Sequence, residues 1–327
     1  MNLKQPKFWN KCSKLNVFLW LNLPLAFIYY LVLLVRKAII KKTKLPAYTI
    51  TIGNFNVGGA GKTPTAIKIK QLLDQKGFNS CFLSKGYKGS LTGPRFIDRH
   101  NFVQETGDEA LLLLKHGQVC IAKNRKDAVS LIAKKKLDLI ILDDGFQNLT
   151  IRHDLKILVI DAKINNGNGF LMPAGPLRQT VNSALREAKI IIYIGKESPP
   201  RFLDNYRNIV INAIYEAKTT LAKNHNYLAF SALANNQKFF NLLKDKGYNV
   251  PLTQEFSDHY FYTEQDLVNL RAIAKRNKLN LVTTSKDYVK IPAKFRDSVL
   301  EFEIELKVEN ENKFYRLFDA AIKKDTA

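Results

Sequence analysis

The sequence predicts an α/β protein with a parallel sheet core, helices on both faces of that sheet and a second, smaller α/β domain. Strand-like apolar segments alternate with helical segments along most of the chain. Leu137–Leu142 is a largely apolar run, which is typical of a central parallel strand covered on both faces. The 327 residues exceed the usual size of one domain, and a new strand–helix series begins at Tyr227–Ser231.

A glycine-dense loop between a strand and a helix predicts a nucleotide phosphate site of the P-loop type. The β-rich run Tyr48–Ile52 leads into this loop, and Gly61-Lys62-Thr63 opens the helical segment Ala66–Leu73. Backbone N–H groups and the helix N-terminus would surround the phosphates of ATP, with the Lys62 charge on the outer phosphates and the Thr63 hydroxyl on Mg²⁺. The expected nucleotide-binding residues are Asn56, Gly58, Gly59, Ala60, Gly61, Lys62, Thr63 and Pro64.

One position departs from the strict P-loop pattern. Asn56 stands where the pattern has its first glycine. We expect the deviation to be tolerated because asparagine also visits the left-handed backbone region. A glycine turn that binds nothing is the alternative, but a turn alone does not require the Gly-Lys-Thr sequence.

Charge and cysteine content narrow the class of protein. The net charge of +22 favours an acidic partner, namely an anionic membrane face, a phosphorylated substrate or nucleic acid. Nucleic acid is the weakest of the three, because 38 of the 51 basic residues are lysines whereas base readout favours arginine. The cysteines Cys12, Cys81 and Cys120 are far apart, which predicts a reduced, intracellular chain without disulfides.

The N-terminal region predicts membrane attachment. Leu15–Val35 contains no charged residue, and lysines and arginines flank it on both sides. The length is marginal for crossing a bilayer, and the absence of a small-residue cleavage site argues against a signal peptide. Both flanks suit an anionic cytoplasmic surface on which the segment dips in or lies flat. A buried core helix is the alternative.

Two adjacent carboxylates follow the central apolar strand. Asp143 and Asp144 come directly after Leu142, downstream of the phosphate loop, which is the Walker-B arrangement for holding Mg²⁺. A solvated turn is the alternative for an isolated pair of this kind. Further along, two prolines restrain the loop that presents Arg178.

The remaining segments give an expected element order and domain division. We expect strands at Phe78–Ser84, Val119–Ala122, Lys156–Ile160, Ile190–Ile194, Tyr227–Ser231 and Asn280–Thr284, and helices within Phe102–Leu114 and at Arg125–Lys135, Asn236–Lys246 and Thr263–Lys275. Tyr206–Ala217 and Thr219–Ala222 predict a pair of extended segments where the domains join. The expected regions are a membrane-associated helix in 1–44, the phosphate-loop domain in 45–212 and a second domain in 213–327, with a two-stranded linker near 206–222.

His259 has an ambiguous local sequence. It follows Asp258 in the aromatic segment Phe256–Tyr260 and could carry a proton or simply pack within a loop. Local sequence favours the packed loop residue.

Seven segments occur in an order that resembles one known family. They are GNFNVGGAGKTP, SKGYKG, TGDEALLL, LDDGFQ, MPAGPLR, FSDHY and TTSKDYVK. Together they resemble the tetraacyldisaccharide 4′-kinases, the lipid A kinases of Gram-negative bacteria, over nearly the whole chain. That family's phosphate loop likewise lacks the first glycine. Two positions depart from the family pattern: Asn148 stands where a histidine is frequent, and Ser285 replaces an acidic residue.

The resemblance implies a specific reaction and place. The family transfers the γ-phosphoryl group of ATP to the 4′-hydroxyl of a tetraacyl glucosamine disaccharide 1-phosphate at the cytoplasmic face of the inner membrane. It has two α/β/α domains joined by a two-stranded linker. The expected partners are therefore this lipid and an anionic membrane surface, with no nucleic acid and no obligate protein partner.

The resemblance also implies roles for individual residues. Asp108 would be the base for the sugar hydroxyl, with His259 as its partner from the second domain, and Lys62 would act on the phosphates. Glu109, Asp143 and Asp144 fall on positions tied to Mg²⁺, together with the Thr63 hydroxyl. Lys85, Arg178 and Lys286 are candidate phosphate or sugar contacts from position and charge.

A membrane-surface ATPase switch of the chromosome-partition or division-site type is the competing hypothesis. Such proteins share the glycine-rich phosphate loop and bind membranes. They place a signature lysine early in the loop, where this chain has Val57, and usually carry their membrane helix at the C-terminus. A switch hydrolyses ATP without phosphorylating lipid, so lipid-dependent phosphate transfer separates the two.

Overall fold

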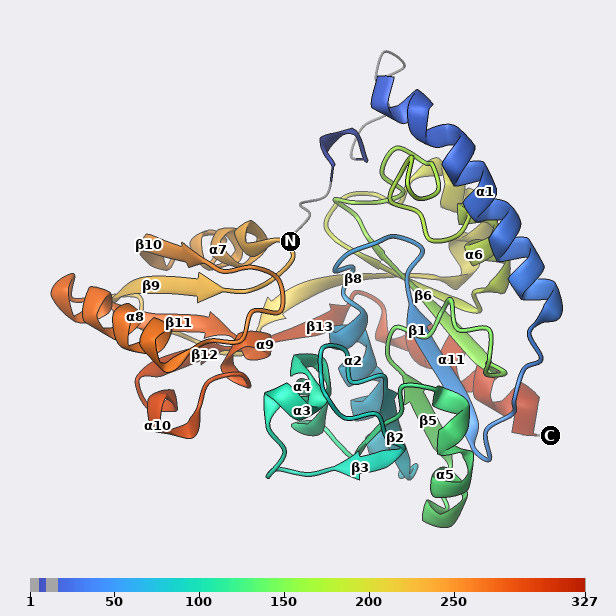
Figure 1. Ribbon diagram of the computed structural model, residues 1–327, viewed down its shortest axis with the longest axis horizontal. Helices are drawn as coiled ribbons and strands as arrows, with labels where there is room; N and C mark the ends of the chain where they lie inside the picture. Colours follow the sequence, from blue (N-terminus) through green and yellow to red (C-terminus); the bar gives the residue numbers. More distant parts are fainter. Residues whose placement is uncertain (1–5, 10–16, 327) are drawn as a thin grey trace.

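The computed structural model describes residues 6–9 and 17–326 and contains two sheets, each flanked by helices (Figure 1). The nine-stranded sheet has the order β13-β8-β7-β6-β1-β5-β2-β4-β3, with β1 (Tyr48–Gly53), β2 (Ser80–Ser84), β3 (Arg95–Ile97), β4 (Val119–Ile121), β5 (Leu139–Leu142), β6 (Leu155–Asp161), β7 (Ile190–Ile194), β8 (Val210–Ala217) and β13 (Ile304–Val308). The four-stranded sheet has the order β10-β9-β11-β12, with β9 (Asn226–Ser231), β10 (Asn249–Glu255), β11 (Asn280–Thr284) and β12 (Val299–Phe302).

The helices alternate with these strands along the chain. The α-helices are α1 (Val17–Ile39), α2 (Lys62–Gln75), α3 (Val103–Thr106), α4 (Asp108–Leu114), α5 (Val129–Lys135), α6 (Val181–Glu187), α7 (Asn236–Asp245), α8 (Glu264–Arg276), α9 (Ser285–Tyr288), α10 (Ala293–Arg296) and α11 (Glu311–Thr326). The 3₁₀ helices are η1 (Lys7–Trp9), η2 (Arg125–Ala128) and η3 (Arg201–Ile209).

Parallel pairing brings the ends of several strands of the nine-stranded sheet to one edge. β1 lies between β5 and β6 and is parallel to both, and β2 lies parallel to β5 and β4. The carboxyl ends of these strands therefore meet, and the segments that follow them lie side by side. The phosphate loop follows β1, Lys85 follows β2, Arg125 lies beyond β4 and the Asp143–Asp144 pair follows β5.

Apolar clusters cover both faces of this sheet, as the sequence predicts. On one face, residues of α2, α4 and α11 pack against Ile50, Ile52 and Ile141. On the other, residues of α5 pack on Ile140 and Leu142, and residues of α6 pack on Leu158 and Ile160. The predicted sheet core with helices on both faces is thus confirmed.

The four-stranded sheet is entirely parallel and has its own core. Phe239, Phe240 and Leu243 of α7 pack on one face, whereas residues of α8 and α10 pack on the other. Figure 1 shows this sheet beside the first one, with β8 and β13 extending between them.

The strand that pairs with β8 differs from the expectation. β8 pairs with β13 in antiparallel register, and Thr219–Ala222 forms no strand. The predicted pair of extended segments at Tyr206–Ala217 and Thr219–Ala222 is therefore wrong: residues 206–209 belong to η3, and the extended neighbour of β8 is β13. The physical reason is the apolar alternation of β13, which buries Leu306 and Val308 in the core of the first sheet and which a four-residue neighbour could not supply.

The end of the chain returns to the first sheet. Besides β13, the helix α11 places Phe314, Phe318 and Ile322 in the same core. Residues 304–326 thus lie with the first sheet, although 213–327 was expected to form the second domain. The division into domains otherwise stays a prediction.

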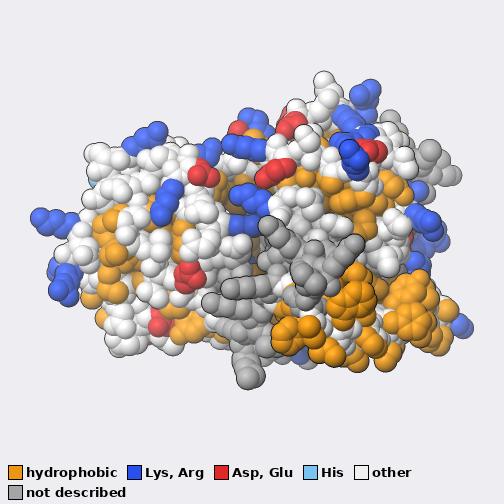
Figure 2. All heavy atoms as spheres, turned by 90° about the horizontal axis from the view of Figure 1, so that it is seen from above, with side chains coloured by type: hydrophobic (Ala, Val, Ile, Leu, Met, Phe, Trp, Pro, Cys, Tyr) orange, Lys and Arg blue, Asp and Glu red, His pale blue; other side chains and the backbone are white. Residues whose placement is uncertain are grey.

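The apolar N-terminal segment forms the long helix α1, which lies along the outside of the first sheet's domain (Figure 1). Leu19, Leu23 and Ala26 pack against Phe170, Leu171 and Ala174. Near the other end of the helix, Lys37 Nζ lies 2.7 Å from Glu187 Oε1. Thirteen large apolar side chains of α1 stay exposed, from Val17 at 66% to Ile39 at 72%. In Figure 2, hydrophobic side chains gather on the side of the molecule that carries α1.

Candidate active site

The phosphate loop has the conformation that anion binding requires. Gly58 and Gly61 both have positive φ angles, 110° and 90°. A Cβ on Gly61 would also lie 2.2 Å from the Tyr215 hydroxyl, so only glycine fits there. The Lys62 ammonium folds back over the loop, 3.4 Å from both Asn54 Oδ1 and the Gly58 carbonyl oxygen. The cation therefore lies over the loop amides, where phosphate oxygens would lie.

Asn56 fits the loop for a different reason from the one expected. It is not among the described residues with positive φ, so the left-handed backbone does not explain it. Instead its buried side chain donates from Nδ2 to the Asn165 carbonyl oxygen at 2.5 Å. Asparagine therefore ties the phosphate loop to the neighbouring loop, which a glycine could not do.

The two carboxylates after β5 have different partners. Asp143 accepts a hydrogen bond from Thr63 Oγ1 at 3.0 Å and is 6% exposed. Asp144 turns toward Arg178, whose Nη1 lies 3.1 Å from Asp144 Oδ1, and toward Lys62 Nζ at 3.7 Å. The sequence-predicted site residues Lys62, Thr63, Asp143, Asp144 and Arg178 are thus brought together.

Asp143 carries an uncompensated charge. Burial and the neighbouring Glu109 carboxylate raise its pKa to about 7, although Lys62 acts in the opposite direction. Its Oδ1 atom is buried and has no hydrogen-bond partner among the described residues. For Asp144, burial alone would raise the pKa, but Lys62 and Arg178 hold it below its usual value. Asp143 is therefore the carboxylate that a further cation would stabilise.

Asp108 and His259 meet across the two sheets. Asp108 begins α4 and is 1% exposed, and His259 Nδ1 lies 2.8 and 2.9 Å from its two carboxylate oxygens. Burial alone would raise the pKa of Asp108, but the His259 hydrogen bond and the charges of Lys286 and Lys290 lower it. Since Nδ1 of His259 faces a carboxylate, this ring nitrogen carries the hydrogen atom and donates a hydrogen bond to Asp108.

A glycine allows close packing of the turn that precedes Asp108. Gly107 has φ 78° and separates α3 from α4, both of which lie within the predicted helical region Phe102–Leu114. A Cβ at this position would lie 2.2 Å from the Tyr87 carbonyl oxygen. The turn containing Tyr87 thus packs directly on the turn before Asp108, and the Tyr87 ring meets the His259 ring edge-on at 5.1 Å. The SKGYKG and TGDE segments therefore pack directly against each other.

Two lysines in and just after α9 also reach this site: Lys286, which the sequence suggested as a phosphate or sugar contact, and Lys290, to which the sequence gave no role. Lys286 Nζ lies 3.4 Å from Glu109 Oε1, 3.4 Å from His259 Nε2 and 3.8 Å from Asp108 Oδ2. Lys290 Nζ is fully buried, 2.6 Å from Asp287 Oδ1 and 4.0 Å from Asp108 Oδ2. Both belong to the TTSKDYVK segment, but only the tertiary structure shows that they face Asp108.

Arg125 begins η2, at the start of the predicted helix Arg125–Lys135, and reaches the backbone of the two carboxylate residues. Its buried guanidinium donates from Nη2 to the Asp143 and Asp144 carbonyl oxygens at 2.7 and 3.3 Å. Its position just beyond a parallel strand was the available signal. Lys85 lies nearby and reaches solvent. Partial desolvation of its ammonium group and the charges of Arg125 and Arg178 lower its pKa, and Asp144 raises it.

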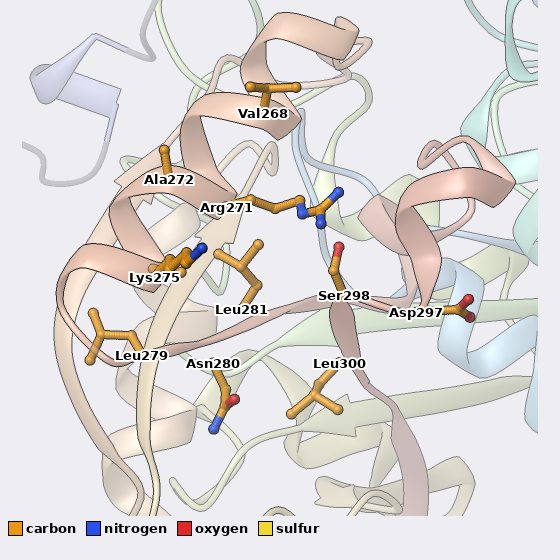
Figure 3. A pocket seen from close by; sticks show the side chains of 11 residues that line it. Val268, Arg271, Ala272, Lys275, Leu279, Asn280, Leu281, Asp297, Ser298 and Leu300 are labelled. Atoms are coloured by element: carbon orange, nitrogen blue, oxygen red, sulfur yellow. The ribbon is translucent and has the colours of Figure 1, made fainter.

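Neither a cluster of three potential metal ligands nor the cavity beside α8 adds residues to this site in the described part of the chain. Within 6–9 and 17–326, no group of three His, Cys, Asp or Glu side chains has metal-ligand spacing. A cavity of about 520 Å³ opens between α8 and the edge strand β12 (Figure 3), lined in part by Arg271, Lys275 and Ser298. It contains none of the predicted site residues.

Comparisons with known proteins show the family of the chain. The model of the tetraacyldisaccharide-1-P 4′-kinase family (LpxK) matches residues 18–323. A tetraacyldisaccharide 4′-kinase from Rickettsia bellii is 36% identical over 99% of this chain and its own full length, and one from Rickettsia canadensis is 37% identical over 95% of each chain. The structure of LpxK from Aquifex aeolicus in complex with ATP superposes with a TM-score of 0.74 at 26% identity, covering 93% of this chain and 99% of that one. The chain therefore belongs to the tetraacyldisaccharide-1-P 4′-kinase family.

Proposed function

We propose that this chain transfers the γ-phosphoryl group of ATP to the 4′-hydroxyl of a tetraacyl glucosamine disaccharide 1-phosphate in lipid A biosynthesis. The observation that carries the proposal is the position of Glu109. It follows the Asp108 that His259 contacts, and its charge raises the pKa of Asp143 beside the phosphate loop. The proposed base for the sugar hydroxyl, Asp108, therefore lies next to the phosphate loop.

The phosphate loop binds ATP. The loop amides and the N-terminus of α2 surround the phosphates, and Lys62 neutralises the outer ones. Arg178 and Lys85 lie at the Asp144 side of this site, where they contact phosphate or sugar oxygens of the substrates. Phosphoryl transfer depends mainly on such positioning and charge neutralisation.

Thr63, Asp143 and Glu109 hold Mg²⁺, with Asp144 beside them. The fit rests on Asp143, which has a buried oxygen without a partner and a raised pKa, both of which a bound cation would relieve. Hard oxygen ligands are those that Mg²⁺ prefers. When bound, Mg²⁺ supplies charge neutralisation on the transferring phosphoryl group.

Asp108 accepts the proton of the sugar hydroxyl. The carboxylate is kept ionised by His259 and the two lysines, which leaves it able to act as a base. Because His259 comes from the second sheet, the pair assembles only when the two sheets approach. That approach also excludes water from the phosphoryl group and limits hydrolysis.

The apolar helix keeps the enzyme at the cytoplasmic face of the inner membrane. α1 is long and apolar enough to cross a bilayer by length and composition. However, it is fixed to the protein at several points along its length, by Leu19, Ala26 and Lys37. We therefore expect α1 to lie in the membrane surface with its exposed apolar face in the lipid, and the net charge of +22 favours anionic lipid.

Label transfer from γ-labelled ATP to the acylated disaccharide 1-phosphate, with Mg²⁺ in detergent micelles, tests the function. Wild type should label the lipid, and Lys62→Ala should lose about 100-fold or more of that rate, since it removes the phosphate cation. Lys68→Ala is the matched control, because Lys68 lies on the same helix and pairs with Glu311 instead. Hydrolysis of ATP without lipid labelling would instead support the membrane-surface ATPase switch.

A further inference from the structure

The loop of residues 165–178, here called the linking loop, is held by the N-terminal region on one side. Tyr29 of α1 donates from its hydroxyl to the Arg178 carbonyl oxygen at 3.0 Å. The Trp9 indole N–H donates to the Pro173 carbonyl oxygen at 3.0 Å, and Asn168 Nδ2 donates to the Phe8 carbonyl oxygen at 3.1 Å. These bonds come from two separate parts of the N-terminal region.

The same loop is bonded to the phosphate loop on its other side. Arg178 N–H donates to the Phe55 carbonyl oxygen at 2.7 Å, and Val57 N–H donates to the Pro176 carbonyl oxygen at 2.8 Å. The Asn56 side chain reaches the Asn165 carbonyl oxygen. The linking loop is therefore the physical connection between α1 and the phosphate site.

The loop is packed well enough to transmit a position. Asn168 is 7% exposed and also donates to the Ala174 carbonyl oxygen at 2.9 Å, and Ala174 is fully buried against α1. Packing and hydrogen bonds anchor the loop at these buried positions, so the loop would move together with α1.

We propose that Tyr29 is a positioning residue that orients Arg178 for phosphoryl transfer, so that the membrane helix forms part of the catalytic framework. The Arg178 peptide groups are bonded on both sides, to Phe55 through the N–H and to Tyr29 through the carbonyl oxygen. The guanidinium that leaves this fixed backbone reaches Asp144. An arginine acts through the fixed geometry of its donors, so a shift of its backbone moves every contact it makes.

The inference rests on the proposed role of Arg178, and it differs from a role of α1 in capturing lipid. A helix that only gathers the lipid would affect KM for the lipid. A helix that orients Arg178 affects kcat, because it acts on the transferring group. The two roles therefore separate in steady-state kinetics.

The test compares full-length Tyr29→Phe and Tyr30→Phe with wild type in the same micelles, varying lipid and ATP. Tyr30 is the next residue of α1, is 36% exposed and forms no hydrogen bond seen in the described part of the chain. Tyr29→Phe should lower kcat about threefold to tenfold, the usual effect of one lost hydrogen bond, with KM for the lipid within about twofold of wild type. Tyr30→Phe should match wild type, and the melting temperatures of all three should agree within about 2 °C.

A double-mutant cycle with Arg178→Lys identifies the residue through which Tyr29 acts. In the Arg178→Lys background, Tyr29→Phe should cost less than about twofold, since the side chain that it orients has changed. Additive losses, an unchanged kcat in Tyr29→Phe, or a change confined to KM would each overturn the inference. If Arg178→Lys alone were as active as wild type, the role of Arg178 itself would be wrong while the kinase activity stood.

Discussion

Asp108 and Asp143 are both buried carboxylates at the same site, yet their surroundings are opposite. Asp108 faces His259, Lys286 and Lys290, all from the second sheet, and its pKa is lowered. Asp143 faces Glu109 from the first sheet, keeps one oxygen without a partner, and has its pKa raised to about 7. Neighbouring cations thus compensate the charge of Asp108, whereas the Glu109 carboxylate repels the charge of Asp143.

The difference supports the roles proposed above for the two carboxylates. A compensated carboxylate stays ionised without help, as a base must before it accepts a proton. A carboxylate without neighbouring compensation is stabilised most by a bound cation, as expected for a ligand of Mg²⁺. Removing either charge should therefore affect catalysis, but with opposite effects on stability.

Asp108→Asn should give the largest effect. Loss of the base should lower kcat for label transfer by about 10²–10⁴-fold, the usual contribution of a general base. His259→Gln should cost less, and it should add little in the Asp108→Asn background, because the imidazole acts through Asp108. Transfer within tenfold of wild type in Asp108→Asn would show that another group is the base.

The same substitution should destabilise the protein. A carboxylate whose folded-state pKa is lowered contributes stability at pH values above its usual pKa, and that contribution is lost as the pH falls through the folded-state pKa. At pH 8, without Mg²⁺, Asp108→Asn should lower the free energy of unfolding in urea by about 1–3 kcal/mol, since it leaves buried cations without their anion.

Asp143→Asn should change stability in the opposite direction. Its folded-state pKa of about 7 lies above the usual value, so the ionised group destabilises the fold, fully so above pH 7. The substitution should raise the free energy of unfolding by about 1–3 kcal/mol at pH 8 without Mg²⁺.

Adding Mg²⁺ sharpens this result. Wild type should gain stability with rising Mg²⁺ by mass action, whereas Asp143→Asn should gain much less. Urea unfolding with and without Mg²⁺ measures both. If Asp143→Asn destabilised the metal-free protein, or if Mg²⁺ stabilised both proteins equally, Asp143 would not be the uncompensated ligand.

His153 serves as a comparison for Asp108 and Asp143 because it is a half-buried titratable group outside both clusters, with the smallest predicted effect on catalysis. Its Nδ1 lies 2.6 Å from Thr51 Oγ1 and its Nε2 lies 2.6 Å from the Asn148 carbonyl oxygen, so Nε2 carries the proton. Burial, with the charges of Lys156 and Arg125, lowers its pKa to about 4.

Because that pKa lies below its unfolded-state value, only the unfolded protein gains this proton as the pH falls. Wild type should lose about 2 kcal/mol of unfolding free energy between pH 6.5 and pH 4 through this group, with its partial exposure taken into account. His153→Gln should lose less over the same range, while kcat at pH 8 should stay within about twofold of wild type. An unchanged slope in the variant would assign the pH dependence to other groups.

The first sheet's half of the site could be predicted from the sequence because it is encoded locally. Lys62 and Thr63 follow a strand within ten residues, and Asp143 and Asp144 directly follow another. Strand ends of a parallel sheet meet at one edge, so the sequence pattern alone places these side chains together. Arg125 obeys the same rule and could have been found by it.

The second sheet's half could not be predicted in this way. The local sequence of His259 favoured a packed loop residue, and only the family resemblance implied its partnership with Asp108, 151 residues earlier. The pairing of β8 with β13 was missed for the same reason, since the matching apolar alternation lies far along the chain. Contacts of this range depend on how whole sheets pack.

The sequence by itself determined the α/β class, the phosphate loop, the acidic strand end and the apolar helix, because each depends on residues close in the chain. The tertiary structure decided which carboxylate is compensated, which lysines face Asp108, and that Tyr29 bonds to Arg178. The physical reason is that charge compensation depends on distance in space, and that distance is set by packing between elements that are far apart in the sequence.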